Sequence, residues 1–328
     1  MTKLNIVGLK NSSIQPSENG TFEHIGAKGG TEQMFERLMK FLPKNVTDEF
    51  NIICSRVRSV DSKKKNILWL HDTWDDPESE HLKDTKSLER FAKLVFVSHY
   101  QQSTYNLGLG VPYSKGVVLQ NAIDPIEAHE KPRGSTINLI YHTTPHRGLE
   151  LLVPVAEYMA RKGMDFHLDV YSSFKIYGWE QRDEPYKELF NRCLRSPNIT
   201  YHGYQPNSVI REALKKAHIY AYPNIWPETS AISVIEAMSA GCQVVCPNFA
   251  ALPETCANFA NMYGWDEDVN NHANLFAGVL FNSMNEQWSE GVQNKLKFQK
   301  MYFDNFYSWD YRKEQWRGFL NSLRDKKS

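Results

Sequence analysis

The chain has 328 residues, enough for two domains, because single hydrophobic cores stop growing at roughly 250–300 residues. Hydrophobic residues make up 41% and aromatic residues 12%, which excludes a disordered chain. Lys plus Arg and Asp plus Glu both number 38, so the formal net charge is zero. The basic footprint of a nucleic-acid-binding protein is therefore missing.

The start of the sequence predicts a strand at residues 4–8 and lacks the layout of a signal peptide. No apolar run reaches the ~20 residues that cross a bilayer. We therefore expect a soluble, cytoplasmic protein. The five scattered cysteines predict reduced, buried thiols rather than a zinc site, because zinc ligands usually stand in closer pairs. We expect neither a bound metal nor a cofactor.

Short apolar runs alternate with helical patterns along the first third of the chain. After residues 4–8, strands are predicted at residues 50–54, 66–70, 94–97 and 116–119, and helices at residues 31–41, 84–92 and 99–107. Strands that alternate with helices favour a parallel sheet covered on both faces.

A polar segment at residues 124–135, DPIEAHEKPRGS, has the composition of a linker, and the alternation restarts beyond it. Further strands are predicted at residues 137–141, 166–171, 199–203, 218–222 and 243–246, with helices at residues 148–162, 184–193, 208–216 and 230–240. Beyond about residue 266 the pattern is purely helical.

The fold class predicted is α/β, with two doubly wound Rossmann-like domains that face a cleft. The first domain covers residues 1–130, and the second covers residues 134–304. A last helix at about residues 307–325 is rich in Trp and Tyr, so we expect it to pack back on the first domain. Open α/β sheets bind ligands beyond the carboxyl ends of their strands, which places the site in the cleft.

Two carboxylates in the segment YPNIWPETSAISVIEAMSAG, residues 222–241, stand in unusual surroundings. Glu228 precedes a predicted helix whose N-cap we expect at Ser230, and Glu236 lies within its apolar stretch. At ~1.5 Å rise per residue, the two lie at most about 12 Å apart. Glu228 can bind a sugar, the open amides of residues 229–232 a phosphate, and Glu236 a ribose.

This segment resembles the E-x7-E signature of the family-four retaining glycosyltransferases, which have the GT-B fold. In that family the first Glu contacts the donor sugar and the second the ribose. The resemblance extends through IEAMSAG and ALPE. The family often has Gly-Phe-Gly after the first Glu, whereas this chain has Thr229, Ser230 and Ala231, and Ile232 follows. Two Glu residues at this spacing also have a purely structural explanation: Glu228 would be stabilised by the helix dipole, and Glu236 would form a salt bridge on the helix. The flanking residues favour the binding role over this alternative.

The segment IYHTTPHRG, residues 140–148, resembles the diphosphate loop of the same family, with Arg147 in the position of its Lys. A guanidinium there can fork onto phosphate oxygens and neutralise a leaving diphosphate. The second basic residue of that loop is missing. His142, Thr143 or His146 can take its place, and the sequence does not choose among them.

Three more positions carry the resemblance. Gly30 belongs to a GGxE turn, where a glycine lets the backbone approach a ligand. His71 follows a predicted strand, at the place of a family His that approaches the donor sugar. Tyr204 follows a strand end that resembles the one near the nucleotide base. None of these forms the G-x-G-x-x-G fingerprint of a nicotinamide enzyme.

The resemblance implies a retaining, metal-independent glycosyltransferase, in which the departing phosphate takes the acceptor proton. Its catalytic residues would be His71, Arg147 and Glu228, and its donor UDP- or GDP-linked. The acceptor, a glycan, lipid or protein, cannot be read from the sequence. A lipid-linked acceptor would bring the enzyme to a membrane surface. A catalytically silent nucleotide-sugar-binding subunit is the alternative.

Overall fold

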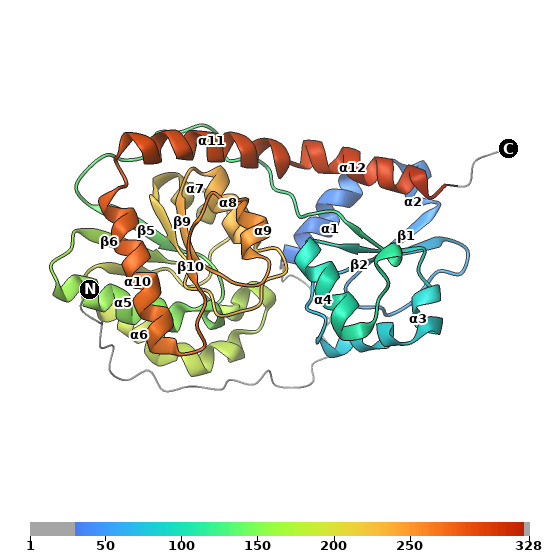
Figure 1. Ribbon diagram of the computed structural model, residues 1–328, viewed down its shortest axis with the longest axis horizontal. Helices are drawn as coiled ribbons and strands as arrows, with labels where there is room; N and C mark the ends of the chain where they lie inside the picture. The colour runs from blue at the N-terminus through green and yellow to red at the C-terminus, as the bar shows by residue number, and fades with distance from the viewer. Residues whose placement is uncertain (1–29, 325–328) are drawn as a thin grey trace.

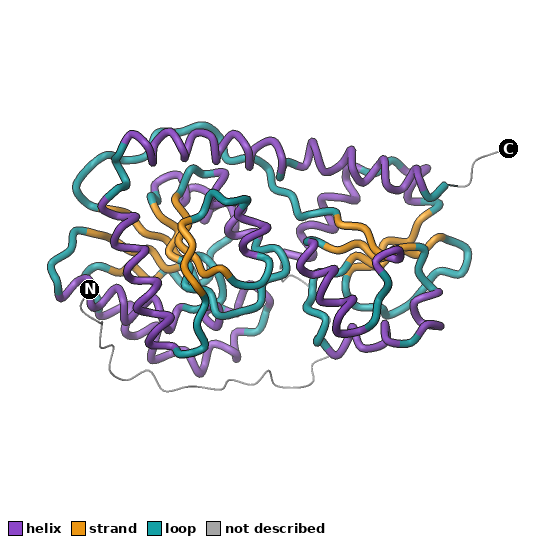
Figure 2. Tube along the Cα trace, viewed as in Figure 1, coloured by secondary structure: helices purple, strands orange, loops and turns teal. Residues whose placement is uncertain are grey.

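The computed structural model describes residues 30–324 of the chain. The strand predicted at residues 4–8 lies outside this range. Two parallel α/β halves stand side by side, and two long helices run along one edge of both (Figure 1). Figure 2 shows the two strand layers, each enclosed by helices.

The N-terminal half has a four-stranded parallel sheet in the order β1-β2-β3-β4. Its elements are α1 (Gly30–Phe41), α2 (Lys44–Thr47), β1 (Phe50–Cys54), β2 (Lys65–Trp69), η1 (Pro77–Lys83), α3 (Thr85–Glu89), β3 (Lys93–Phe96), α4 (His99–Leu109), η2 (Tyr113–Lys115) and β4 (Gly116–Val118). Among the described strands the order simply follows the chain, without the reversal of a doubly wound sheet.

Alternation along β2 divides the core of this half into two layers. Ile67 and Trp69 pack against α1 and the last helix of the chain, while Leu68 packs with α4 on the opposite face. The predicted helix at residues 84–92 is shorter than expected. Asp84 is the N-cap of α3, and the helix ends at Glu89, a few residues before β3 begins.

The C-terminal half has a six-stranded parallel sheet in the order β10-β9-β8-β5-β6-β7. Its elements up to β8 are β5 (Ile137–Tyr141), η3 (Pro145–Arg147), α5 (Leu149–Arg161), β6 (Phe166–Val170), η4 (Phe174–Tyr177), η5 (Glu180–Tyr186), α6 (Lys187–Arg195), β7 (Ile199–Tyr201), α7 (Asn207–Lys216) and β8 (Ile219–Ala221). The order reverses between β5 and β8, so a crevice opens at their carboxyl ends.

The remaining elements are α8 (Ile232–Ser239), β9 (Gln243–Asn248), α9 (Leu252–Cys256), β10 (Asn261–Gly264), α10 (Val269–Asn285), α11 (Glu290–Phe306) and α12 (Trp309–Ser322). The sequence patterns missed α2, α9 and β10, which are too short for a clear period. The helical stretch after residue 266 is present as expected.

Within residues 30–324 the chain crosses between the halves twice, and these two crossings are bonded to each other. Ile123 donates its N–H to the carbonyl of Tyr307 at 2.7 Å, and Trp309 donates to the carbonyl of Ile123 at 3.2 Å. Beyond this crossing, α12 returns to the first half, where Trp316 packs edge-on to Trp69 with ring centroids 4.9 Å apart. Burial of these rings holds α12 on the N-terminal sheet.

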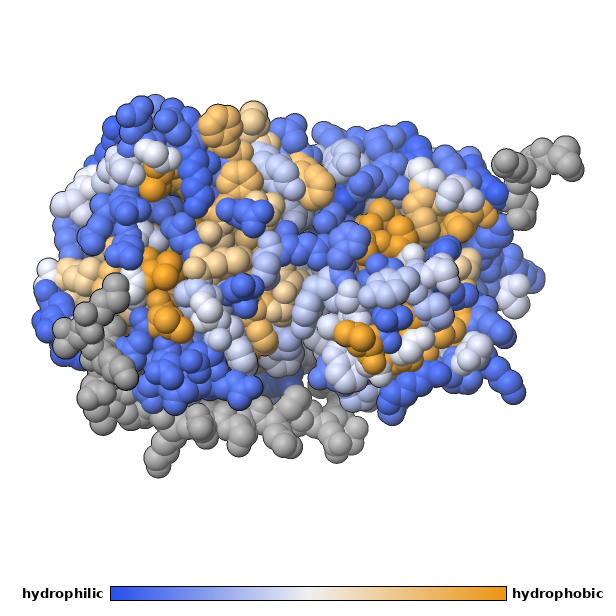
Figure 3. Space-filling model, in the orientation of Figure 1, coloured by the Kyte–Doolittle hydropathy of each residue, from blue (hydrophilic) through white to orange (hydrophobic). Residues whose placement is uncertain are grey.

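The surface in view is largely hydrophilic, with apolar side chains gathered in separate patches (Figure 3). On α11, Phe298 and Met301 are 62% and 57% exposed. No helix among residues 30–324 has both the length and the apolar character to cross a bilayer.

Candidate functional site

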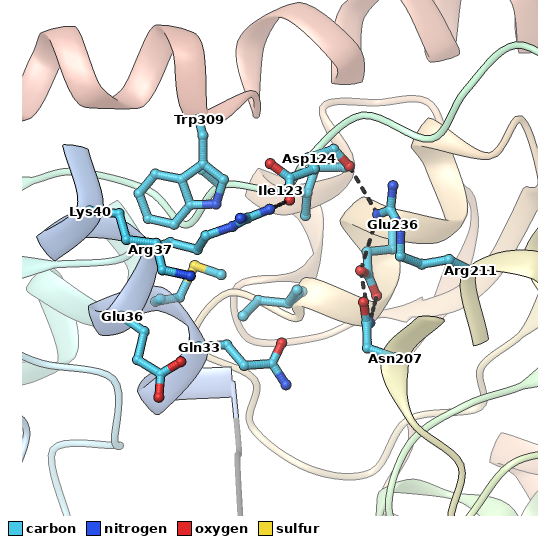
Figure 4. Close-up of a pocket in the computed structure, with 13 residues that line it drawn as sticks. Gln33, Glu36, Arg37, Lys40, Ile123, Asp124, Asn207, Arg211, Glu236 and Trp309 are labelled. Carbon is cyan, nitrogen blue, oxygen red and sulfur yellow. Dashed lines mark hydrogen bonds and ion pairs between the residues drawn. The ribbon is translucent and has the colours of Figure 1, made fainter. Parts of the chain in front are cut away.

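A cavity of about 240 Å³ lies between the two halves (Figure 4). Helix α1 forms one wall, the crossing at residues 122–124 forms the back, and α7 and α8 form the opposite wall. The lining residues are Gln33, Met34, Glu36, Arg37, Lys40, Ala122, Ile123, Asp124, Asn207, Arg211, Ile232, Glu236 and Trp309. Glu236 therefore faces the interdomain cavity, as the sequence analysis requires of a ribose-binding carboxylate.

Glu236 is 7% exposed and is held by two side chains of α7. The amide Nδ2 of Asn207 donates to both carboxylate oxygens, at 3.0 and 3.2 Å, and Nη1 of Arg211 lies 3.6 Å from Oε1. Burial raises the pKa of Glu236, and the two partners only partly oppose this. The carboxylate is thus held at the cavity by two side chains of α7.

The same arginine also fastens the crossing segment. Arg211 donates to the carbonyls of Asp124 and Pro125 at 2.9 and 3.0 Å. From the other half, Arg37 of α1 forms an ion pair with the Asp124 carboxylate (Figure 4). Helices of both halves are thereby tied to one short segment at the back of the cavity.

Arg147 and Glu228 form a second cluster, at the carboxyl ends of β5 and β8. Glu228 is 5% exposed, and its Oε1 accepts hydrogen bonds from Nη1 of Arg147 and from the hydroxyl of Tyr222. Burial lowers the pKa of Arg147, but Glu228 and nearby Tyr177 raise it more, so it ends well above its usual value. Burial also raises the pKa of Tyr222 and keeps it a hydroxyl donor.

Arg147 reaches this place because of a tight strand-to-helix turn. Gly148, with φ +111°, ends η3 and precedes α5, and a Cβ there would lie 2.0 Å from the carbonyl oxygen of Pro223. Only glycine allows the turn after β5 to pass so close to the backbone that follows β8. The turn positions the Arg147 guanidinium beside Glu228.

The start of α8 differs from the prediction. Ser230 is not the N-cap; that place belongs to Ala231, which has φ +51° and makes no side-chain cap. The Ser230 carbonyl instead accepts a hydrogen bond from Thr255 at 2.9 Å. The N–H groups of Ile232 and Ser233 lie in the first turn, have no intrahelical acceptor and can receive an anion.

Gly30 lies opposite this turn, at the start of α1. A Cβ on Gly30 would lie 3.1 Å from Cδ1 of Ile232, so the two helix N-termini meet across the domain junction. Both ends carry partial positive charge. The glycine predicted from the sequence therefore stands beside the predicted phosphate position.

His71 follows β2, and its backbone carbonyl accepts a hydrogen bond from Thr229 Oγ1 at 2.8 Å. Its ring packs on Trp69, and neither ring nitrogen has a well-aligned partner among the described residues. Burial lowers the pKa of His71 to about 3, against a smaller opposing effect of the Trp69 backbone. The imidazole is neutral at pH 7 and has unused hydrogen-bonding capacity.

Two further histidines lie beside Arg147. His142 packs on Tyr220 with ring centroids 4.5 Å apart, and His146 stacks on Phe174. Burial lowers the pKa of each to about 3. His142 Nε2 and His146 Nδ1 are enclosed and lack a hydrogen-bond partner among residues 30–324. Thr143 is half-buried, and none of the three residues lines the cavity.

The structure does not gather every predicted residue at the cavity. Tyr204 is 41% exposed and does not line it, and Glu228 lies in the Arg147 cluster rather than on the cavity wall. Asn207, Arg211 and Asp124 were not predicted. Asn207 and Arg211 reach the site because α7 leads back from the edge strand β7 and packs against β5 and α8. A helical pattern alone did not distinguish these two residues.

Comparison with known proteins identifies the family of this chain. The sequence profile of the family "Glycosyl transferases group 1" matches residues 127–290, half of the chain. The chain belongs to the group 1 glycosyl transferases.

Among curated relatives of this glycosyl transferase is the O-antigen chain mannosyltransferase B of Escherichia coli. The two are 31% identical over 113 residues, which cover 34% of this chain and 28% of the relative. The chain thus matches little more than a quarter of that protein's length.

Solved structures show the same fold. A glycosyltransferase from Rickettsia africae ESF-5 gives a TM-score of 0.68 at 14% identity, over 93% of this chain and 85% of that one. Anabaena HepE in complex with UDP gives 0.62 at 14% identity, over 79% and 73%. The GT-B fold predicted from the sequence is confirmed.

The positive φ at Ala231 generates a stability prediction. An L-residue in left-handed geometry is strained, so we expect Ala231→Gly to raise the free energy of unfolding by about 1 kcal/mol, measured by urea denaturation. Ala237→Gly, in the interior of the same helix, is the control and should lower it by at least about 1 kcal/mol. If both variants lowered the free energy of unfolding, Ala231 would not be strained.

Three half-buried histidines with enclosed ring nitrogens, His71, His142 and His146, predict how stability depends on pH. Each has a folded pKa of about 3, below the 6.5 of an unperturbed histidine, so the unfolded chain binds more protons between these values. Their contribution is complete above pH 6.5 and is lost as the pH falls. Urea denaturation should give a lower unfolding free energy at about pH 5 than at about pH 7, and His71→Gln should reduce the difference. If His71→Gln left the difference in unfolding free energy between the two pH values unchanged, His71 would not be held neutral in the folded chain.

Proposed function

We propose that this group 1 glycosyl transferase moves a sugar from a nucleotide-sugar donor to an acceptor with retention of anomeric configuration. One observation carries the proposal: Arg147 and the open first turn of α8 stand at the crevice between β5 and β8, while Glu236 lines the adjoining cavity. These groups supply positive charge for a diphosphate and a hydrogen-bond acceptor for a ribose.

The donor lies along the segment from Glu228 to Glu236. The ribose hydroxyls bind Glu236 and displace part of its contact with Asn207, and the diphosphate faces the amides of Ile232 and Ser233. Solved structures of Anabaena HepE contain UDP and UDP-glucose, which supports a nucleotide-sugar as the donor class. UDP- and GDP-sugars are therefore the donors to test first.

Cleavage of the sugar–phosphate bond places negative charge on the leaving diphosphate. Arg147 is already fixed by Glu228, so it can stabilise that charge without reorganising. Glu228 and the neutral His71 offer hydrogen bonds to the sugar hydroxyls. In the family that the E-x7-E segment resembles, the departing phosphate takes the acceptor proton. This arrangement needs no metal ion, because the protein supplies the positive charge.

The N-terminal half faces the donor segment and would carry the acceptor. We propose a cytoplasmic enzyme whose acceptor is a glycan, a lipid or a protein; a lipid-linked acceptor would bring it to a membrane surface. A catalytically silent nucleotide-sugar-binding subunit is the second candidate. It is favoured by the Arg147–Glu228 ion pair, because Glu228 offsets part of the positive charge that Arg147 offers a diphosphate.

Substitution of the two charged groups tests the proposal. Arg147→Ala and Glu236→Ala should each weaken binding of UDP or GDP by roughly tenfold or more, because each removes a hydrogen bond to a charged group. Titration calorimetry measures the affinity, and donor turnover separates an enzyme from a silent subunit. Arg192→Ala is the control, because Arg192 pairs with Glu157 outside the cavity. It should leave the nucleotide affinity and the donor turnover unchanged. Normal binding and turnover in both site variants would refute the proposal.

A further inference from the structure

Glu254 belongs to the C-terminal half but bonds to a helix of the N-terminal half. Its Oε1 accepts the backbone N–H of His99 at 2.9 Å, and its Oε2 accepts the N–H of Tyr100 at 3.1 Å. These are the first two residues of α4, where helix N–H groups lack intrahelical acceptors. A carboxylate at a helix N-terminus is stabilised both by charge-assisted hydrogen bonds and by the helix dipole.

The helix that carries Glu254 is bonded to the donor segment on its other side. Ala251, the N-cap of α9, donates its N–H to the carbonyl of Glu228 at 3.1 Å, and Thr255 Oγ1 donates to the carbonyl of Ser230 at 2.9 Å. Glu254 lies between these two residues. A shift of the Glu228–Ser230 backbone must therefore move the carboxylate that holds α4.

Helix α4 in turn holds the loop after β2. The side chain of Gln101 donates to the carbonyl of Asp72 at 2.8 Å, and that carbonyl also receives the hydroxyl of Tyr105. Asp72 follows His71, whose own carbonyl accepts Thr229 Oγ1. The bonds form a closed ring from the donor segment through α9, Glu254 and α4 to His71 and back to Thr229.

We propose that Glu254 is a positioning residue: it latches the N-terminal half onto the donor segment and so holds His71 beside Thr229. The latch is a property of the folded chain. Its response to nucleotide rests on the proposed function, because a diphosphate at α8 would act on Ser230 and, through Thr255, on Glu254.

The latch is tested by amide hydrogen exchange of the full chain, read at single residues by mass spectrometry. In Glu254→Ala, exchange at His99 and Tyr100 should rise roughly tenfold or more, and it should also rise at residues 71–73 and 229–231. Glu254→Gln keeps one acceptor oxygen and should give a smaller rise. Unchanged exchange at His99 and Tyr100 in Glu254→Ala would overturn the proposal.

Ser98→Ala is the matched control, because Ser98 caps the same helix from within its own half by accepting the N–H of Gln101. It should raise exchange at Gln101 and leave residues 229–231 unchanged. If it reproduced the pattern of Glu254→Ala, weakening of α4 alone would explain the result and the latch would be refuted.

UDP and GDP, added separately, test the coupling. The nucleotide that binds should slow exchange at His99 and Tyr100 in the wild-type chain and in Ser98→Ala, but not in Glu254→Ala. The same slowing in Glu254→Ala would refute the coupling. If neither nucleotide bound the wild-type chain, the proposed function would fail, while the ligand-free comparison would still decide on the latch.

Discussion

The partly buried guanidinium of Arg147 is the charge on which the site depends. A positive charge in such surroundings needs a partner, and Glu228 supplies it at the carboxyl ends of β5 and β8 while accepting a second hydrogen bond from the Tyr222 hydroxyl. Gly148 allows the turn that carries Arg147 to pass close to the backbone after β8, on the segment that leads to Glu228. Glu228 thus holds the Arg147 guanidinium in a fixed position, and the open backbone amides at the start of α8 add further hydrogen-bond donors.

The second half of the site exists only because the two domains meet. Glu236 lines a cavity whose opposite wall is α1, and Arg211 and Arg37 tie both walls to Asp124. Thr229 and Glu254 add bonds that cross the junction at His71 and at α4. In the proposed function, a donor bound here is held by the C-terminal half, and its reacting end faces the N-terminal half.

The sequence predicted the α/β architecture, since strand and helix periods are local. It also predicted that Glu236 faces the space between the two halves, where the structure places it. Placement of Ser230 as N-cap was wrong, because residue preference ignored the strained backbone at Ala231. Asn207, Arg211 and Glu254 act through contacts between elements far apart in the chain. No local pattern encodes such pairings, and α9, which carries Glu254, has too few residues for a visible period.

A crystal structure of the chain with UDP or GDP tests the central claim most directly. The account predicts that the diphosphate lies within hydrogen-bonding distance of the Ile232 and Ser233 amides and of the Arg147 guanidinium. It also predicts that the ribose hydroxyls bind the Glu236 carboxylate in place of Asn207. A nucleotide bound elsewhere, or one whose diphosphate avoids Arg147 and the start of α8, would contradict it.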